Sequence, residues 1–144
     1  MAFQQESLNV FYFWSGVLVL KLLSMTVLTA RQRFSKKTFA NPEDAAGLPN
    51  SKVGFNDPDI ERIRRAHLND LENILPWFAI TYIWLGTGPS PWLARVLIRS
   101  FAASRIIHTI VYAIIPKQPH RALAFFIGFF ITGYEAVSTM LYYY

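Results

Sequence analysis

The chain has 144 residues, of which 53% are hydrophobic and 16% aromatic, and its formal net charge at pH 7 is +5. Charged residues make up only 16%, against roughly 25% in a soluble domain, so the apolar excess is better placed against lipid than in a core. The absence of cysteine excludes disulfides, thiolate metal sites and a cysteine nucleophile. At this length we expect a single domain over residues 1–144.

The first apolar segment, residues 10–30, is long enough to cross a bilayer, because a spanning helix needs about 20 mostly apolar residues. Lys21 is the one charge in it, and we expect it to snorkel or to pair within a bundle, for instance with Glu135. No cleavable signal peptide is visible, so the segment is expected to act as an uncleaved anchor. A basic stretch opens the following loop, residues 31–57, which carries turn signals.

The second segment, residues 58–86, joins a densely charged stretch to an apolar run without a turn signal. Asp57 is predicted to be its helix N-cap. A helix of this length is about 40 Å long, more than the roughly 30 Å of a hydrocarbon core, so its basic start should protrude into the cytosol. Pro76 is expected to kink it. Ionisable groups that continue into a membrane segment are costly and usually functional.

Residues 92–115 and 122–144 form the third and fourth apolar segments, so we predict an all-α, integral membrane four-helix bundle. Basic residues follow the first and third segments, whereas the connection between the second and third, residues 86–91, carries no charge. The positive-inside rule therefore places the two basic loops in the cytosol and both termini on the opposite side. Because the basic residues adjoin membrane segments, they argue against a nucleic-acid partner.

Two polar stripes follow from helical spacing, since residues three, four or seven positions apart share a face. They are Arg65, Asn69 and Glu72 in the second segment and Arg105, His108 and Tyr112 in the third, with Arg121 at the cytosolic start of the fourth. Both stripes should turn away from lipid. The resulting cationic pocket suits a small anionic ligand such as glutathione, because arginine clamps carboxylates and a guanidinium stabilises a thiolate. With three histidines and no cysteine, we predict no metal site.

The segment of residues 61–76, ERIRRAHLNDLENILP, closely resembles the signature of the MAPEG superfamily, the membrane-associated proteins of eicosanoid and glutathione metabolism. Three more pieces are similar, in order, to its microsomal glutathione transferase 1 branch: TFANPED (residues 38–44), ASRIIHT (103–109) and QPHRAL (118–123). The match covers nearly the whole chain in one register. The 61–76 segment is highly specific, whereas the other three would be weak alone.

The resemblance implies a homotrimer that binds glutathione, its co-substrate, between neighbouring subunits near the cytosolic side. By motif position, the expected glutathione-binding residues are Arg33, Arg64, Arg65, His67, Asn69, Glu72, His108, Tyr112 and Arg121. Arg121 matches the residue that supports the thiolate and is the expected catalytic residue. The resemblance further implies transfer of glutathione to lipophilic electrophiles and reduction of lipid hydroperoxides. The expected location is the endoplasmic reticulum membrane, with the outer mitochondrial membrane as the alternative.

The chain also departs from related patterns. Leu68 stands where the prostaglandin E synthase branch carries arginine, and Ala122 and Phe125 replace that branch's serine and tyrosine near the active centre. These departures argue against isomerase chemistry of that kind. Ala45 stands where some transferases carry cysteine, so activation through a modified thiol is excluded.

Plainer interpretations stand beside the functional ones. The arginines Arg33, Arg64 and Arg65 also fit ordinary positive-inside charges, and Glu72 with Arg105 also fits a purely structural ion pair. The histidines and Tyr112 also fit packing roles. The alternative functions are a prostaglandin E synthase-type isomerase and a non-catalytic lipid-binding adaptor of the same fold. An ion-conducting bundle fits less well, because the charges gather at one end.

Overall fold

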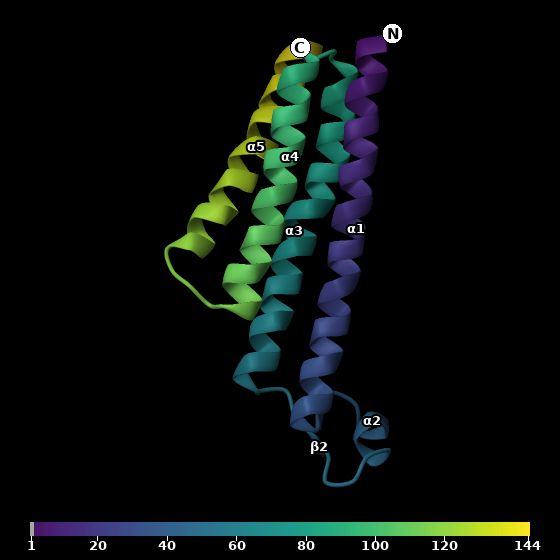
Figure 1. The fold of residues 1–144 in the computed structure, drawn as a ribbon, viewed down its shortest axis with the longest axis vertical. Coiled ribbons are helices and arrows are strands. Elements are labelled where there is room, and N and C mark those ends of the chain that lie inside the picture. Colours follow the sequence, from purple (N-terminus) through teal and green to yellow (C-terminus); the bar gives the residue numbers. More distant parts are fainter. Residues whose placement is uncertain (1) are drawn as a thin grey trace.

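The computed structural model describes residues 2–144, with side chains from residue 5 onward. Within these residues four long helices run side by side along the longest axis of the molecule (Figure 1). They are α1 (Ala2–Lys36), α3 (Pro58–Gly86), α4 (Pro91–Thr109), which continues as a π-helical turn η1 (Ile110–Ile114), and α5 (His120–Tyr143). The all-α prediction is therefore confirmed, although α1 extends beyond its predicted apolar segment at both ends.

The four helices form a bundle in which sequence neighbours are not always spatial neighbours. Helix α1 packs against α3 and α4, and α5 packs against the same two helices. Between α1 and α5 no packing is found in the described residues, so these two lie on a diagonal of the bundle. Both chain ends lie at one end of the bundle, and the connection from α1 to α3 lies at the other (Figure 1).

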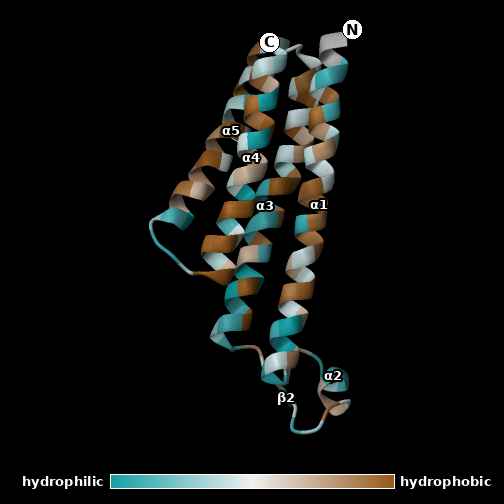
Figure 2. Cartoon of the chain, in the orientation of Figure 1, coloured by the Kyte–Doolittle hydropathy of each residue, from teal (hydrophilic) through white to brown (hydrophobic). Residues whose placement is uncertain are grey.

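Three stretches of the described chain are long and apolar enough to cross a membrane: Gln5–Lys36, Pro91–Ile114 and His120–Tyr143. Four spanning segments were expected, so this part of the prediction holds for three helices. Helix α3 differs because its charged residues continue to Glu72, and the apolar run after it is shorter than the roughly 20 residues that a span needs. Hydrophilic residues accordingly gather at the ends of α1 and α3 near their connection (Figure 2).

The core is built around Trp77 of α3, whose side chain is fully buried. Its ring stacks on that of Phe101 in α4, with centroids 4.3 Å apart and an interplanar angle of 4°. Phe11 of α1 packs against the same ring at 5.6 Å. Three helices therefore meet at one aromatic cluster. Pro76 precedes the central tryptophan, and α3 continues through it without a break.

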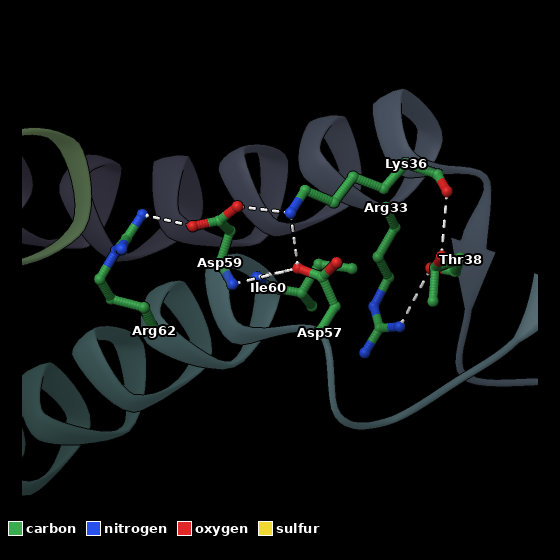
Figure 3. Close-up of polar contacts among 7 residues, drawn as sticks. All are labelled: Arg33, Lys36, Thr38, Asp57, Asp59, Ile60 and Arg62. Atoms are coloured by element: carbon green, nitrogen blue, oxygen red, sulfur yellow. Dashed lines mark hydrogen bonds and ion pairs between the residues drawn. The ribbon is translucent and has the colours of Figure 1, made fainter.

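The connection between α1 and α3 was expected to be a loop, and it contains short elements. These are β1 (Thr38–Phe39), α2 (Pro42–Ala46) and β2 (Lys52–Val53), the two strands pairing in parallel. The predicted N-cap is confirmed, since the Asp57 carboxylate accepts hydrogen bonds from the backbone N–H groups of Asp59 and Ile60. The Lys36 ammonium joins the end of α1 to this cap (Figure 3).

Candidate functional site

A cleft of about 250 Å³ lies between α3, the η1 end of α4 and the start of α5. It brings together four of the residues expected to bind glutathione, namely Asn69, His108, Tyr112 and Arg121. The other lining residues are Gln118, Ala122, Phe125 and Phe126. We call this the Arg121 cleft. Residues separated by more than 50 positions thus share one cavity, as the polar stripes predicted.

Arg121 lies in the first turn of α5 and its guanidinium is held by two neighbours. Its Cζ atom lies 4.6 Å from the ring centroid of Tyr112, a geometry in which the ring face attracts the cation. The side-chain amide of Gln118 faces the same guanidinium, which can only donate, so the amide oxygen accepts from Nε at 3.1 Å. The ring of His108 meets that of Tyr112 edge-on, with centroids 5.3 Å apart.

A second hollow of about 420 Å³ lies between α1 and α3 and contains three more of the expected residues, Arg33, Arg64 and His67. We call it the Arg33 groove. Arg33 donates a hydrogen bond to the backbone oxygen of Thr38 at 3.4 Å (Figure 3), and Arg64 pairs with Glu61 at 2.8 Å. The structure therefore places these residues on the α1 side of α3, away from Arg121.

The two remaining expected residues lie apart from both cavities. Glu72 is exposed and lines a third groove, of about 280 Å³, between α3 and α5. Arg65 is exposed on α3 and lines none of the three. Both side chains are exposed on a single chain, so for these two residues the turn away from lipid stays a prediction. The α4 stripe does turn inward, since Arg105 and His108 are buried.

A network of buried charges connects three helices beside the Arg121 cleft. Asp70 of α3 forms ion pairs with Lys21 of α1 and with Arg105 of α4, the latter at 2.9 Å. Lys21 therefore pairs within the bundle, as expected, but its partner is Asp70 and not the suggested Glu135. Arg105 pairs with Asp70, so the alternative interpretation of Glu72 and Arg105 as an ion pair does not hold. Glu135 instead accepts a hydrogen bond from Thr81 at 2.6 Å.

Asp70 is the residue that sequence reasoning missed, although a signal for it exists. The buried positions of α3 include Ile63, Ala66, Asp70, Ile74 and Trp77, with spacings of three and four. Asp70 is thus the acidic member of the apolar face of an amphipathic helix. An ionised carboxylate on that face needs a cationic partner, and Lys21 and Arg105 supply two.

The cleft is suited to binding an anion. It contains one guanidinium, a histidine, two side-chain amides and a phenol, all of which can donate hydrogen bonds. In the part of the chain that the structure describes, no group of three or more histidine, aspartate or glutamate side chains is arranged to hold a metal ion. Together these residues can hold a charged, hydrogen-bonding ligand between α3, η1 and the start of α5.

Comparisons with known proteins place the chain in a family. The family model that matches is the MAPEG family, over residues 11–141. The chain is 40% identical over 144 residues to microsomal glutathione S-transferase 1 of Mus musculus, covering 95% of this chain and 93% of that one. It is also 39% identical over 120 residues to the prostaglandin E synthase of Bos taurus, covering 83% and 78%. A match of this extent identifies the chain as a member of the MAPEG family.

Proposed function

We propose that this protein is a membrane-bound glutathione transferase that conjugates the glutathione thiolate to lipophilic electrophiles and also reduces lipid hydroperoxides. The observation that carries the proposal is the Arg121 cleft, where a guanidinium, an imidazole, two amides and a phenol converge between membrane helices. The likeness to proteins named glutathione transferase supports it. The proposed location is the endoplasmic reticulum membrane, with the cleft open toward the cytosol.

Arg121 takes the catalytic role in this proposal. A thiol attacks only as its thiolate, and a guanidinium beside the sulfur lowers the thiol pKa; each unit corresponds to about 1.4 kcal/mol. The thiolate then forms a carbon–sulfur bond to the electrophile, whose leaving group departs with the electron pair. With a hydroperoxide, the thiolate attacks the outer oxygen and releases the alcohol, and a second glutathione completes the disulfide with loss of water.

The separation of the expected residues supports a site shared between copies of the chain. Arg33, Arg64 and His67 lie in the Arg33 groove, between α1 and α3. The Arg121 cleft is on the α5 side, and at about 250 Å³ it is smaller than most ligand pockets, which measure about 300–1,000 Å³. We therefore propose that the groove of one subunit meets the Arg121 cleft of its neighbour in a homotrimer, and that one glutathione contacts both.

The electrophile is proposed to arrive through the bilayer. One wall of the Arg121 cleft is formed by Phe125 and Phe126 of α5, and Phe126 is 48% exposed. The apolar surface of α5 continues along Phe129 and Phe130, which are also exposed. A lipophilic molecule dissolved in the membrane can follow this surface to the thiolate without crossing water.

The test is a titration of detergent-purified protein with glutathione, followed by the ultraviolet absorbance of the thiolate and by calorimetry. We expect saturable binding with thiolate formation at neutral pH in the wild type. Arg121→Ala should retain assembly but lose the thiolate signal and turnover, whereas Arg31→Ala, which removes an exposed arginine outside the expected site, should behave as the wild type. Unchanged turnover in Arg121→Ala contradicts the catalytic role, and absence of binding in the wild type contradicts the enzyme.

The likeness to a prostaglandin E synthase makes an isomerase the second candidate. The three departures from that branch all fall in the proposed site. Ala122 and Phe125 line the Arg121 cleft, and Leu68 lines the Arg33 groove. Neither Ala122 nor Phe125 offers a hydroxyl beside Arg121, so we favour conjugation. Product analysis with an endoperoxide substrate separates the two, because only the isomerase converts it to the hydroxy-ketone.

A further inference from the structure

The side chain of Arg105 lies behind the Arg121 cleft and is fully buried. Its Nη2 atom meets three acceptors: Oδ1 of Asn69 at 2.7 Å, Oδ1 of Asp70 at 2.9 Å and Nδ1 of His108 at 3.2 Å. Nη2 has two hydrogens, so one of them is shared. Two of the three acceptors, on Asn69 and His108, belong to residues that line the cleft.

The chemistry of arginine fixes the state of both cleft residues. A guanidinium is always charged and only donates hydrogen bonds, so Nδ1 of His108 has to accept. The imidazole is then neutral and carries its proton on Nε2. By the same argument Asn69 turns its amide oxygen toward Arg105, which leaves its Nδ2 hydrogens for another partner.

The position of Arg105 is in turn fixed from two other helices. Asp70 accepts from Arg105 through Oδ1, while its Oδ2 accepts from the Thr109 hydroxyl at 3.4 Å and pairs with Lys21. Asp70 has no exposed surface. A buried ion pair is weak evidence for stability, because its desolvation cost offsets its attraction. These contacts support a role in holding the neighbouring groups in one geometry better than a role in stabilising the fold.

We propose that Arg105, anchored by Asp70, is a positioning residue that locks His108 in its Nε2–H tautomer and turns the Asn69 amide. Each of the two then presents an N–H donor to an anionic ligand in the Arg121 cleft. This inference rests on the proposed function for the identity of the ligand, a glutathione carboxylate or thiolate. The tautomer itself does not depend on any ligand.

The first experiment is nitrogen-15 NMR of histidine-labelled, detergent-solubilised protein without glutathione, with the His108 signals assigned by their loss in His108→Gln. We expect an unprotonated Nδ1 and a protonated Nε2 in the wild type. Arg105→Gln should lose this single tautomer, while Lys21 and Asp70 still pair and keep the remaining charges balanced. The control is Glu135→Gln, which likewise replaces a fully buried ionisable side chain by glutamine and should leave the His108 signals unchanged.

Several outcomes overturn the proposal. A wild-type His108 that is protonated on Nδ1, or on both ring nitrogens, contradicts the proposal. This measurement does not depend on whether any variant folds. An unchanged tautomer in Arg105→Gln also contradicts the proposal. If Arg105→Gln does not fold, Asp70→Asn provides the second variant, in which the loosened guanidinium should broaden or split the His108 signals, and unchanged signals count against the proposal.

The second experiment measures the glutathione dissociation constant by calorimetry on the same proteins. Arg105→Gln should weaken binding about tenfold, or about 1.4 kcal/mol, with the thiolate signal at saturation retained because Arg121 is intact. Equal affinity in the wild type and Arg105→Gln contradicts the positioning role. If the wild type does not bind glutathione, the proposed function fails, while the tautomer measurement still decides whether Arg105 sets the state of His108.

Discussion

Asp57 ties the first turn of α3 to the end of α1. Its carboxylate accepts hydrogen bonds from the backbone N–H of Asp59 at 3.0 Å and of Ile60 at 3.2 Å, and the Lys36 ammonium lies 2.9 Å away. The hydrogen bond from Lys36, followed by those from the two amides, holds the pKa of Asp57 below its ordinary value of 3.8. A lowered pKa means that this stabilisation is complete above pH 3.8 and is lost as the pH falls through the folded-state value.

Hydrogen exchange of the first turn of α3 measures this effect. At neutral pH, amide protection there should decrease in Asp57→Asn, which loses the charge pair with Lys36, and decrease further in Asp57→Ala, which also loses the cap. As the pH falls from 3.8 through the lower folded-state pKa of Asp57, the wild type should approach Asp57→Asn. The control is Asp44→Asn, an exposed change that should leave α3 unaffected. Equal protection in the wild type and Asp57→Ala would contradict the role of this carboxylate.

Whether sequence reasoning succeeds for a residue depends on where its partners are. The N-cap of α3 was predicted because the cap, the following proline and the acidic first turn are adjacent in the chain. The partner of Lys21 was not, because Asp70, Glu72 and Glu135 are all acidic candidates in helices. Which one meets Lys21 or Arg105 depends on how each helix is rotated in the bundle, and spacing within one helix does not fix that rotation.

At the scale of elements, Gly128 sets how closely α5 approaches α4. A Cβ atom at this position would lie 3.2 Å from Oγ of Ser104 and 3.4 Å from Cε2 of Phe101, and the Ser104 hydroxyl is already bound to the Phe101 carbonyl at 2.7 Å. Overpacking of this kind costs about 1–3 kcal/mol. We therefore expect Gly128→Ala to lower the thermal stability of the detergent-solubilised protein.

The matched control for that change is Gly16→Ala in α1, where an added Cβ meets no atom within 4 Å and the helix gains from the better helix former. Because Gly128→Ala has the same propensity gain, the difference between the two variants isolates the contact between α4 and α5. Equal unfolding temperatures for both variants would show that the two helices separate without cost.

The helices themselves could be predicted because their apolar runs and caps are continuous in the sequence. Two elements could not. The π-helical turn η1 lies in the stretch Ile110–Ile114, where no proline or glycine distinguishes it from the α-helix before it. The paired strands β1 and β2 have two residues each, too few to show an alternating pattern, so that region looked like a loop.

For the molecule as a whole, the polar stripes predict one pocket and the family resemblance implies a site between neighbouring subunits, whereas a single chain divides the expected residues among separate cavities. Helical spacing places residues on a common face of one helix but does not show which neighbour covers that face. Arg33 and Arg121 therefore come from different sides of α3. The separation of the two arginines follows from the packing of α1 and α5, which lie on a diagonal of the bundle.

The orientation of the bundle in the membrane is the prediction that belongs to this scale. Basic residues flank the connection between α1 and α3, while both chain ends lie at the opposite end of the bundle (Figure 1). The positive-inside rule therefore predicts a cytosolic connection and termini on the other side. The chain has no cysteine, so single cysteines introduced as Glu43→Cys and Tyr144→Cys, both at exposed positions, can be labelled without background.

In sealed microsomes, whose outer surface is the cytosolic one, an impermeant maleimide should react with the cysteine of Glu43→Cys at once. The cysteine of Tyr144→Cys should react only after the membrane is permeabilised. The reverse pattern would place the basic connection in the lumen and would remove the Arg33 groove, which lies beside that connection, from cytosolic glutathione. Labelling of both before permeabilisation would mean that the helices do not place the two ends of the bundle on opposite sides of the bilayer.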